Sequence, residues 1–153
     1  MSENDDFVVQ DFLPFLLNRA AEDSSLEFQI LYKGRYGMLR TEWRVLFHLG
    51  MYHRMTAREI STRAKIHKTK ISRAVAKLAE RRWVSRNRDE TDRRSEHLEL
   101  TAAGRAVYED LREQAKSYDA KLAAQFSAED VALLRRMLRR LANMEAAAKS
   151  GGL

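Results

Sequence analysis

The chain has 153 residues, a size that suits one domain with its own hydrophobic core. With 44% hydrophobic and 33% charged residues but 1 Pro and 6 Gly, its composition excludes a disordered, collagen-like or many-turned all-β chain. The absence of cysteine excludes a disulfide framework, a thiolate zinc site, cysteine catalysis and a thiol redox switch. The apolar stretches are too short to span a bilayer and residues 1–6 are acidic, unlike a signal peptide, so we expect a soluble, cytoplasmic protein.

The net charge of +6 is concentrated in the middle of the chain. Residues 54–94 contain 14 Lys or Arg against 5 Asp or Glu, whereas the remainder is slightly acidic. This asymmetry favours a face that binds a polyanion, although a solvated basic surface without a partner has the same composition. The position of these charges on the secondary structure has to decide between the two.

The first half of the chain predicts two helices before the basic segment. Asp11 suits the N-cap of the first helix, and Pro14 falls in its first turn, where a missing N–H costs little. Residues 33–37 predict a loop, and Thr41 is expected to cap the second helix.

Two short helices follow, of which the second is basic. Thr56-Ala57-Arg58-Glu59 is a capping box, which fixes the start of a helix that ends near Ala64. After a break at residues 65–67, a fourth helix has an apolar face and a basic face. The apolar face holds Ile71, Ala74, Val75 and Leu78, and the basic face holds Lys70, Arg73, Lys77 and Arg81. Such a pair of helices predicts a helix-turn-helix.

The second half predicts a β-wing and two long helices. Residues 83–86 and 96–100 flank a charged tip, and the second segment alternates with a strand period. Small, aromatic and apolar residues then recur at alternating spacings of four and three, which predicts a long helix that packs lengthwise on another. They are Gly104, Tyr108, Leu111, Ala115, Tyr118 and Leu122. Ser127 caps the last helix, whose apolar face holds Leu134, Met137, Leu138, Leu141 and Met144.

The order of these elements resembles the MarR family of bacterial transcriptional regulators over about residues 10–147. The most specific match is Asp92-x-Arg94 followed by Leu100-Thr101-Ala102-Ala103-Gly104. Many members have Gly between the recognition helix and the first wing strand, where this chain has Arg82. A left-handed backbone at that position is therefore an open question.

The resemblance implies a fold that is mainly α with a small β-wing. A winged helix-turn-helix lobe over residues 39–100 would lie between long dimerisation helices at 10–33 and 101–147, all within a single domain of residues 1–153. Two such chains would form a homodimer whose lobes straddle double-stranded DNA.

The start of the fourth helix suits a phosphate. Lys68 and Lys70 are cations at a helix N-terminus, where each opposes the macrodipole by about 0.3–1 kcal/mol. If a phosphate approaches, the helix dipole and the lysines attract it together. Arg73 lies one turn further along and is a candidate for a bidentate contact with guanine, the alternative being a contact with phosphate alone.

The resemblance assigns Arg94 of the wing to the minor groove, with Asp92 orienting its guanidinium. The alternative is an Asp92–Arg94 pair that only stiffens the wing. The complete set of expected DNA-binding residues is Thr56, His67, Lys68, Thr69, Lys70, Ser72, Arg73, Lys77, Arg86, Arg88, Asp92, Arg93 and Arg94.

Family members often bind a small aromatic or anionic effector between the dimer helices and the lobe. The matching segment supplies aromatic walls and cations, namely Tyr32, Arg35, Tyr36, Trp43, Arg44 and His48. The alternative is that Trp43 belongs to the core and Arg44 is solvated. The histidines show no pair at metal-ligand spacing, and no metal or cofactor is expected.

We therefore expect a homodimeric, sequence-specific transcriptional regulator, a repressor rather than an activator, that binds a palindromic operator. An enzyme is not expected, because the chain has no phosphate-binding Gly loop, nucleophile motif or metal quartet. The first alternative is a non-specific architectural DNA-binding protein, and the second is a helical protein that binds an acidic partner.

Overall fold

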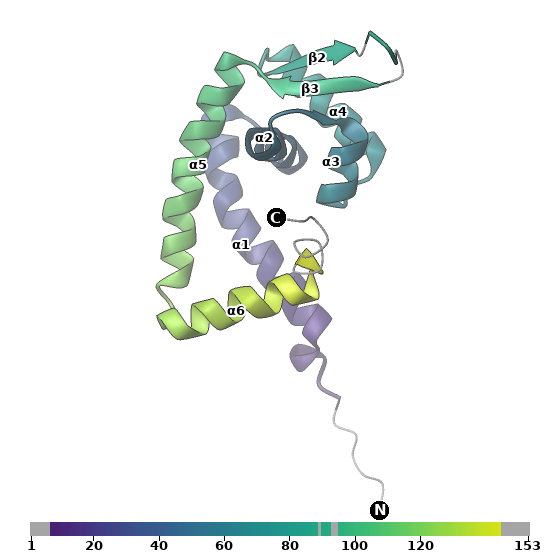
Figure 1. Cartoon of the computed structure of the whole chain (residues 1–153). Coiled ribbons are helices and arrows are strands. Elements are labelled where there is room, and N and C mark those ends of the chain that lie inside the picture. Colours follow the sequence, from purple (N-terminus) through teal and green to yellow (C-terminus); the bar gives the residue numbers. More distant parts are fainter. Residues whose placement is uncertain (1–6, 89, 93–94, 145–153) are drawn as a thin grey trace, which may run out of the picture. The chain divides into compact units, whose positions relative to one another are not determined.

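The computed structural model describes residues 7–88, 90–92 and 95–144. It divides into two units, Met1–Arg112 and Glu113–Leu153, and one helix crosses the boundary. The elements follow in the order η1 (Val9–Asp11), α1 (Leu13–Tyr36), α2 (Arg40–Tyr52), β1 (Met55–Thr56), α3 (Ala57–Ala64), α4 (Lys68–Glu80), β2 (Val84–Arg88), β3 (Glu96–Leu100), α5 (Ala102–Ala123) and α6 (Ala128–Leu141) (Figure 1). This mainly α architecture with a small sheet confirms the predicted fold class.

The core of the first unit lies where α2, α3 and α4 meet beneath the sheet (Figure 1). The predicted apolar face of α4 is buried, since the side chains of Ile71 and Leu78 are fully inaccessible. Opposite them, α2 contributes Val45, Leu46 and Leu49, which are also fully buried. Burial of each such aliphatic side chain stabilises the fold by about 1.5–3 kcal/mol, so this packing fixes which face of α4 remains exposed.

The sheet has three antiparallel strands in the order β1-β3-β2. β2 and β3 confirm the predicted wing, with Arg86 opposite Leu98. β1 was not predicted, because two residues are too short to show an alternating pattern. Met55 of β1 pairs with Leu98 of β3, and both side chains are buried, so β1 holds the wing against the start of α3.

The boundaries of α1 differ from the prediction at both ends. The first turn contains Pro14 as expected, but Asp11 belongs to the short helix η1 and Phe12 is the N-cap residue. The predicted loop at residues 33–37 is wrong, because α1 continues through Tyr36. It ends only at Gly37, which has a φ of 64° and can adopt this left-handed conformation without a Cβ penalty.

The cap of α2 also differs from the prediction. The N-cap residue is Leu39, and Thr41 lies inside the first turn. The carboxylate of Glu42 accepts a hydrogen bond from the Leu39 backbone N–H at 3.0 Å. The Glu42 side chain therefore pairs the backbone N–H of the N-cap residue, as the glutamate of a capping box does, although the N-cap residue has no hydroxyl group.

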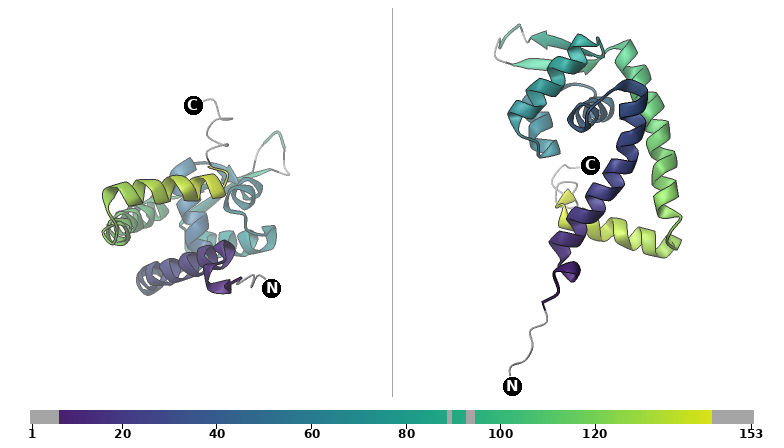
Figure 2. Two further views of the ribbon diagram at one scale, coloured as in Figure 1. Left: turned by 90° about the horizontal axis from the view of Figure 1, so that it is seen from below. Right: turned by 180° about the vertical axis from the view of Figure 1, so that it is seen from behind.

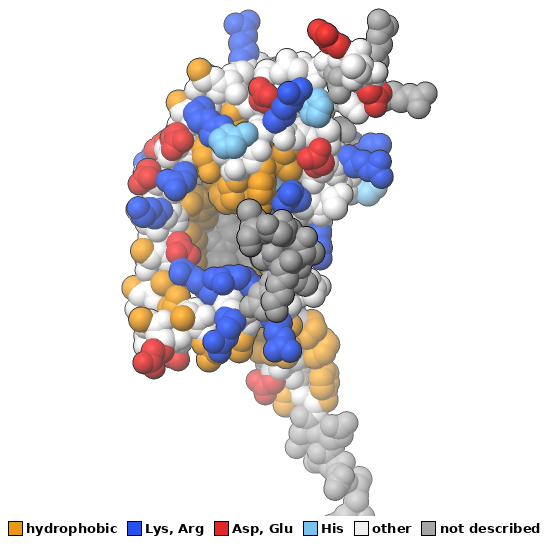
Figure 3. Space-filling model, in the orientation of Figure 1, with side chains coloured by type: hydrophobic (Ala, Val, Ile, Leu, Met, Phe, Trp, Pro, Cys, Tyr) orange, Lys and Arg blue, Asp and Glu red, His pale blue; other side chains and the backbone are white. Residues whose placement is uncertain are grey.

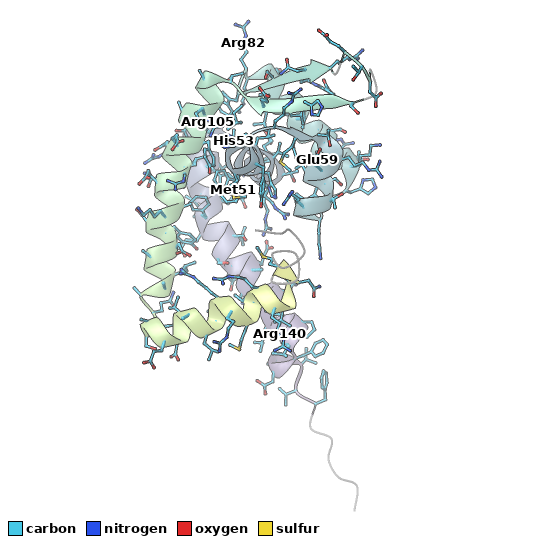
Figure 4. The ribbon with its side chains drawn as sticks, in the orientation of Figure 1. Met51, His53, Glu59, Arg82, Arg105 and Arg140 are labelled. Carbon is cyan, nitrogen blue, oxygen red and sulfur yellow. The ribbon has the colours of Figure 1, made fainter. Side chains whose placement is uncertain are left out.

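The Leu-Thr-x-x-Gly motif joins the end of α4 to the start of α5. The Thr101 hydroxyl donates to the Arg82 carbonyl at 2.6 Å and accepts from the Gly104 N–H at 3.0 Å. A Cβ on Gly104 would lie 2.0 Å from the Trp83 carbonyl oxygen, so only glycine permits this approach. Arg82 has a φ of 61°, so the backbone is left-handed at this position although the residue is not glycine. Its side chain projects away from the lobe (Figure 4).

The first half of α5 is also tied to α1 and α2. The C-terminal end of α1 meets the first half of α5 (Figure 2), where the Asp110 carboxylate accepts hydrogen bonds from Arg35 and Tyr36. Arg105 donates to the Gly50 carbonyl at 3.3 Å, at the C-terminal end of α2 (Figure 4). These contacts position α5 against the lobe from two sides.

The second unit contains the end of α5 and α6. The Ser127 hydroxyl accepts a hydrogen bond from the Asp130 N–H at 3.1 Å, which confirms the predicted cap. The predicted apolar face of α6 is exposed in the single chain, with side chains 38–60% accessible at Leu134, Met137, Leu138, Leu141 and Met144. No helix of the described segments is long and apolar enough to cross a membrane.

Replacing Gly104 by alanine should lower the free energy of unfolding by about 2–3 kcal/mol, because the new methyl group meets backbone and the backbone must move. Gly34 offers a matched control within α1, since a Cβ there meets nothing within 4 Å. Gly34→Ala should raise stability by about 0.5–1 kcal/mol. Urea denaturation of both variants checks the pair, and equal effects would contradict the proposed close approach.

Candidate nucleic-acid interface

The outer face of α4 is polar and accessible along its whole length. Its exposed side chains include Lys68, Thr69, Lys70, Ser72, Arg73 and Lys77, all of which the sequence predicted. No acidic residue lies in the first turn of this helix. Lys77 approaches Glu80 at 4.0 Å, but both side chains are about 70% accessible, so this pair contributes little. In Figure 3, Lys and Arg side chains stand out from the surface of the lobe.

His67 is the N-cap residue of α4. Its Nδ1 atom accepts a hydrogen bond from the Thr69 backbone N–H at 3.1 Å. The imidazole therefore satisfies one of the N–H groups that every helix start leaves unpaired. His67 thus has a structural role in addition to the predicted contact with DNA.

The turn between α3 and α4 is held by side chains from two helices. The Ser61 hydroxyl donates to the Ile66 carbonyl at 2.6 Å, and the Arg44 guanidinium of α2 donates to the Ala64 carbonyl at 2.7 Å. Lys65 ends α3 with a φ of 53°, a left-handed conformation that usually favours glycine. The sequence did not identify this residue, since only the backbone angle makes it unusual.

Arg81 is exposed like the other residues of the predicted basic face, but its side chain is bound to another part of the lobe. Its guanidinium donates to the carbonyl oxygens of Tyr36 and Gly37, which lie at the end of α1. It also lies over the Trp83 ring, 4.8 Å from the ring centre. Arg81 therefore links α4 to the α1–α2 connection.

Arg86 in the wing is paired with an acidic residue. Its guanidinium donates two hydrogen bonds to the Glu96 carboxylate, at 2.8 and 3.1 Å. These hydrogen bonds lower the pKa of Glu96 and raise the pKa of Arg86. A DNA phosphate would have to compete with Glu96, whereas Arg88 extends from the same strand with its side chain exposed.

The tip of the wing is described only in part. Asp92 is exposed, and its carboxylate accepts a hydrogen bond from the Ser95 hydroxyl at 3.2 Å. Arg93 and Arg94 lie outside the described residues, so the predicted pairing of Asp92 with Arg94 remains a prediction.

Thr56 has the local role that the capping box predicts. Its hydroxyl accepts a hydrogen bond from the Glu59 N–H at 3.1 Å and is 3.2 Å from the Glu59 carboxylate. Replacement by alanine would cost about 1 kcal/mol for the cap alone. Thr56 is half-accessible, and its contact with a phosphate stays a prediction.

The residues predicted to line an effector pocket divide into two groups. Tyr32 is buried and stacks on Trp43, with 5.7 Å between ring centres, within an aromatic cluster that also contains Phe28 and Phe47. Arg35 and Tyr36 bind Asp110.

Arg44 and His48 form the second group, and they contact each other through the Arg44 carbonyl, 2.6 Å from His48 Nδ1. Of the six predicted residues, Arg44 alone lines a pocket at the start of α2.

That pocket lies between the start of α2 and the α3–α4 turn and has a volume of about 300 Å³. It is lined by Arg40, Thr41, Arg44, Lys65, Ile66, His67 and Lys70. Burial, followed by repulsion from Arg40, lowers the pKa of Arg44. Among the residues that the structure describes, no three His, Cys, Asp or Glu side chains come together as metal ligands.

Comparison with known proteins places this geometry in context. Residues 36–95 match the MarR family. The uncharacterized HTH-type transcriptional regulator YwoH of Bacillus subtilis is 28% identical over 95 residues, which are 62% of this chain and 69% of that protein. The MarR family transcriptional regulator SPO1453 of Silicibacter pomeroyi is 27% identical, with a TM-score of 0.79 over 91% of this chain and 98% of that one.

A third similar protein shares the fold at lower identity. It is Bordetella bronchiseptica BpsR, which is 18% identical with a TM-score of 0.79 over 89% of this chain and 96% of that one. Its structure concerns the regulation of its DNA binding by 6-hydroxynicotinic acid.

The stability of this lobe should fall as the pH decreases below about 6.5. Burial lowers the pKa of His48, with further lowering by Arg44 and Arg63, so the unfolded chain binds a proton that the folded chain resists. Urea denaturation at pH 7.5, 6.5 and 5.5 measures this slope. His48→Gln should flatten it. An unchanged slope in His48→Gln would contradict this explanation.

Proposed function

We propose that this chain is a DNA-binding transcriptional regulator of the MarR family, which residues 36–95 match, and that it represses transcription as a homodimer on a palindromic operator. The observation that carries this proposal is the outer face of α4. A sequence selected only for stability would place acids in the first turn of a helix, whereas this face begins with Lys68 and Lys70.

The proposed docking places the start of α4 in the major groove. Arg73 then lies one turn inside the helix, where a guanidinium can bind guanine O6 and N7 in a bidentate manner. Lys70 and Lys77 flank it on the same accessible face and would bind phosphates. From the wing, Arg94 would enter the minor groove with Asp92 beside it, as the family resemblance implies.

The proposed homodimer explains why apolar side chains at both ends of the described chain are exposed to solvent in a single chain. Phe7, Val8, Val9, Phe12 and Leu13 are 44–63% accessible around the start of α1, where Figure 3 shows exposed hydrophobic side chains. The apolar face of α6 is exposed as well. A two-fold dimer would bury both sets and present two copies of α4 to successive major grooves.

Release by a small effector is the last part of the proposal. Support comes from BpsR, whose DNA binding is regulated by 6-hydroxynicotinic acid. The aromatic cluster around Trp43 is packed in the lobe, so the ligand would gain more from nearby cations than from these rings.

Two substitutions on α4 separate base recognition from phosphate binding. Arg73→Ala should weaken binding by about 1–3 kcal/mol and remove the preference for one base pair, because a bidentate contact is lost. Lys77→Gln should weaken binding equally on all duplexes and reduce the slope of log affinity against log salt by about one. Fluorescence anisotropy on a panel of single-base-pair variants, at three salt concentrations, measures both effects. Uniform weakening by Arg73→Ala would show that Arg73 contacts only phosphate.

A further inference from the structure

The pocket between α2 and the α3–α4 turn concentrates positive charge inside the first unit. Four permanent cations line it, namely Arg40 and Arg44 from α2, Lys65 from the turn and Lys70 from α4. His67 lies among them, and no Asp or Glu is part of the lining. At about 300 Å³, its volume is at the lower end of the range for small-molecule sites.

Most of this charge has no acidic partner. In the segments that the structure describes, Arg40 pairs with Glu22 at 3.1 Å, but no carboxylate lies within 4.0 Å of Arg44, Lys65 or Lys70. Arg44 is half-buried and donates to the neutral carbonyl of Ala64. A charge that is partly withdrawn from water is normally paired with a counter-charge, so Arg44 is the cation that a bound anion would compensate, whereas Lys65 and Lys70 are exposed and would add to the attraction.

Two helix starts add to the positive potential. α2 begins at Arg40 and α4 begins at Lys68, so the positive ends of both helix dipoles lie at this pocket. The hydroxyl of Thr41 offers a further hydrogen-bond donor in the lining. Guanidinium, ammonium and hydroxyl donors around a small cavity suit a phosphate or carboxylate group.

We propose that this pocket binds a small polyanion carrying a phosphate or carboxylate group and that the bound anion weakens DNA binding. The second part rests on the proposed function. Lys70 and His67 line the pocket and also belong to the expected DNA contacts at the start of α4. An anion there neutralises these groups and repels the phosphate that the helix start would otherwise attract.

Lys65 allows a test that separates this role from a structural one. Because its backbone is left-handed, Lys65→Gly removes the ammonium group and suits the local conformation, so the variant should fold with unchanged or higher melting temperature. Lys77→Gln removes one charge from the outer face of α4 and is the matched control, since Lys77 does not line the pocket. Arg40→Gln is a second pocket variant.

The probe is inorganic pyrophosphate, measured by titration calorimetry without DNA at constant ionic strength. Wild type should show saturable binding that Lys65→Gly and Arg40→Gln weaken about tenfold and Lys77→Gln leaves unchanged. Absence of saturable binding would overturn the proposal. Loss of binding in Lys77→Gln but not in Lys65→Gly would do so too, because the anion would then occupy the DNA-binding face.

The second measurement is DNA affinity with and without saturating pyrophosphate, at the same ionic strength. Pyrophosphate should weaken DNA binding by wild type about tenfold and should need a concentration about tenfold higher to do so in Lys65→Gly, whose affinity for DNA alone should match that of wild type. If Lys65→Gly weakens DNA binding as Lys77→Gln does, the pocket receives a backbone phosphate of DNA, and the proposal of a free ligand is overturned. If wild type binds no DNA, the proposed function fails while the calorimetric result for the pocket still stands.

Discussion

The rest of the lobe depends on the close approach of the Trp83 carbonyl to Gly104. α4, the wing and α5 all meet at this point, because β2 starts directly after Trp83 and α5 starts directly after β3. Thr101 adds hydrogen bonds to the backbone on both sides of the contact. The Trp83 carbonyl is part of the backbone between α4 and β2, so it cannot shift without moving these elements. This contact, the joint, therefore fixes the orientation of α4 relative to the start of α5. In a dimer held by the terminal helices, such a joint would fix the spacing of the two recognition helices.

The core and the charged surface of α4 depend on the same helix packing. Burial of Ile71 and Leu78 against α2 leaves Arg73 and Lys77 on the accessible side. The same packing brings the start of α2 to the start of α4, where the cationic pocket lies. An anion in that pocket and a phosphate of DNA would therefore be attracted by overlapping groups, which provides a physical basis for mutually exclusive binding.

Sequence reasoning succeeded where a residue's local chemistry dominates. The apolar spacing of α4, the hydroxyl caps at Thr56 and Ser127 and the wing strands follow from short-range rules, and the structure confirms them. It failed where a partner distant in sequence decides. Arg81 has the spacing of the basic face but binds the carbonyl oxygens of Tyr36 and Gly37, 45 and 44 residues away. The cationic pocket was missed for the same reason, since only folding brings α2 to the α3–α4 turn.

In the proposed dimer, the exposed face of α4 reads a DNA sequence in two copies related by a two-fold axis. Selection of bound duplexes from a random pool tests it most directly, at near-physiological salt where non-specific binding is weak. A two-fold dimer should enrich a palindrome with half-sites about 10 base pairs apart. Recovery of DNA without any shared motif would contradict it and favour a non-specific architectural role. Recovery of no DNA would contradict the DNA-binding function itself.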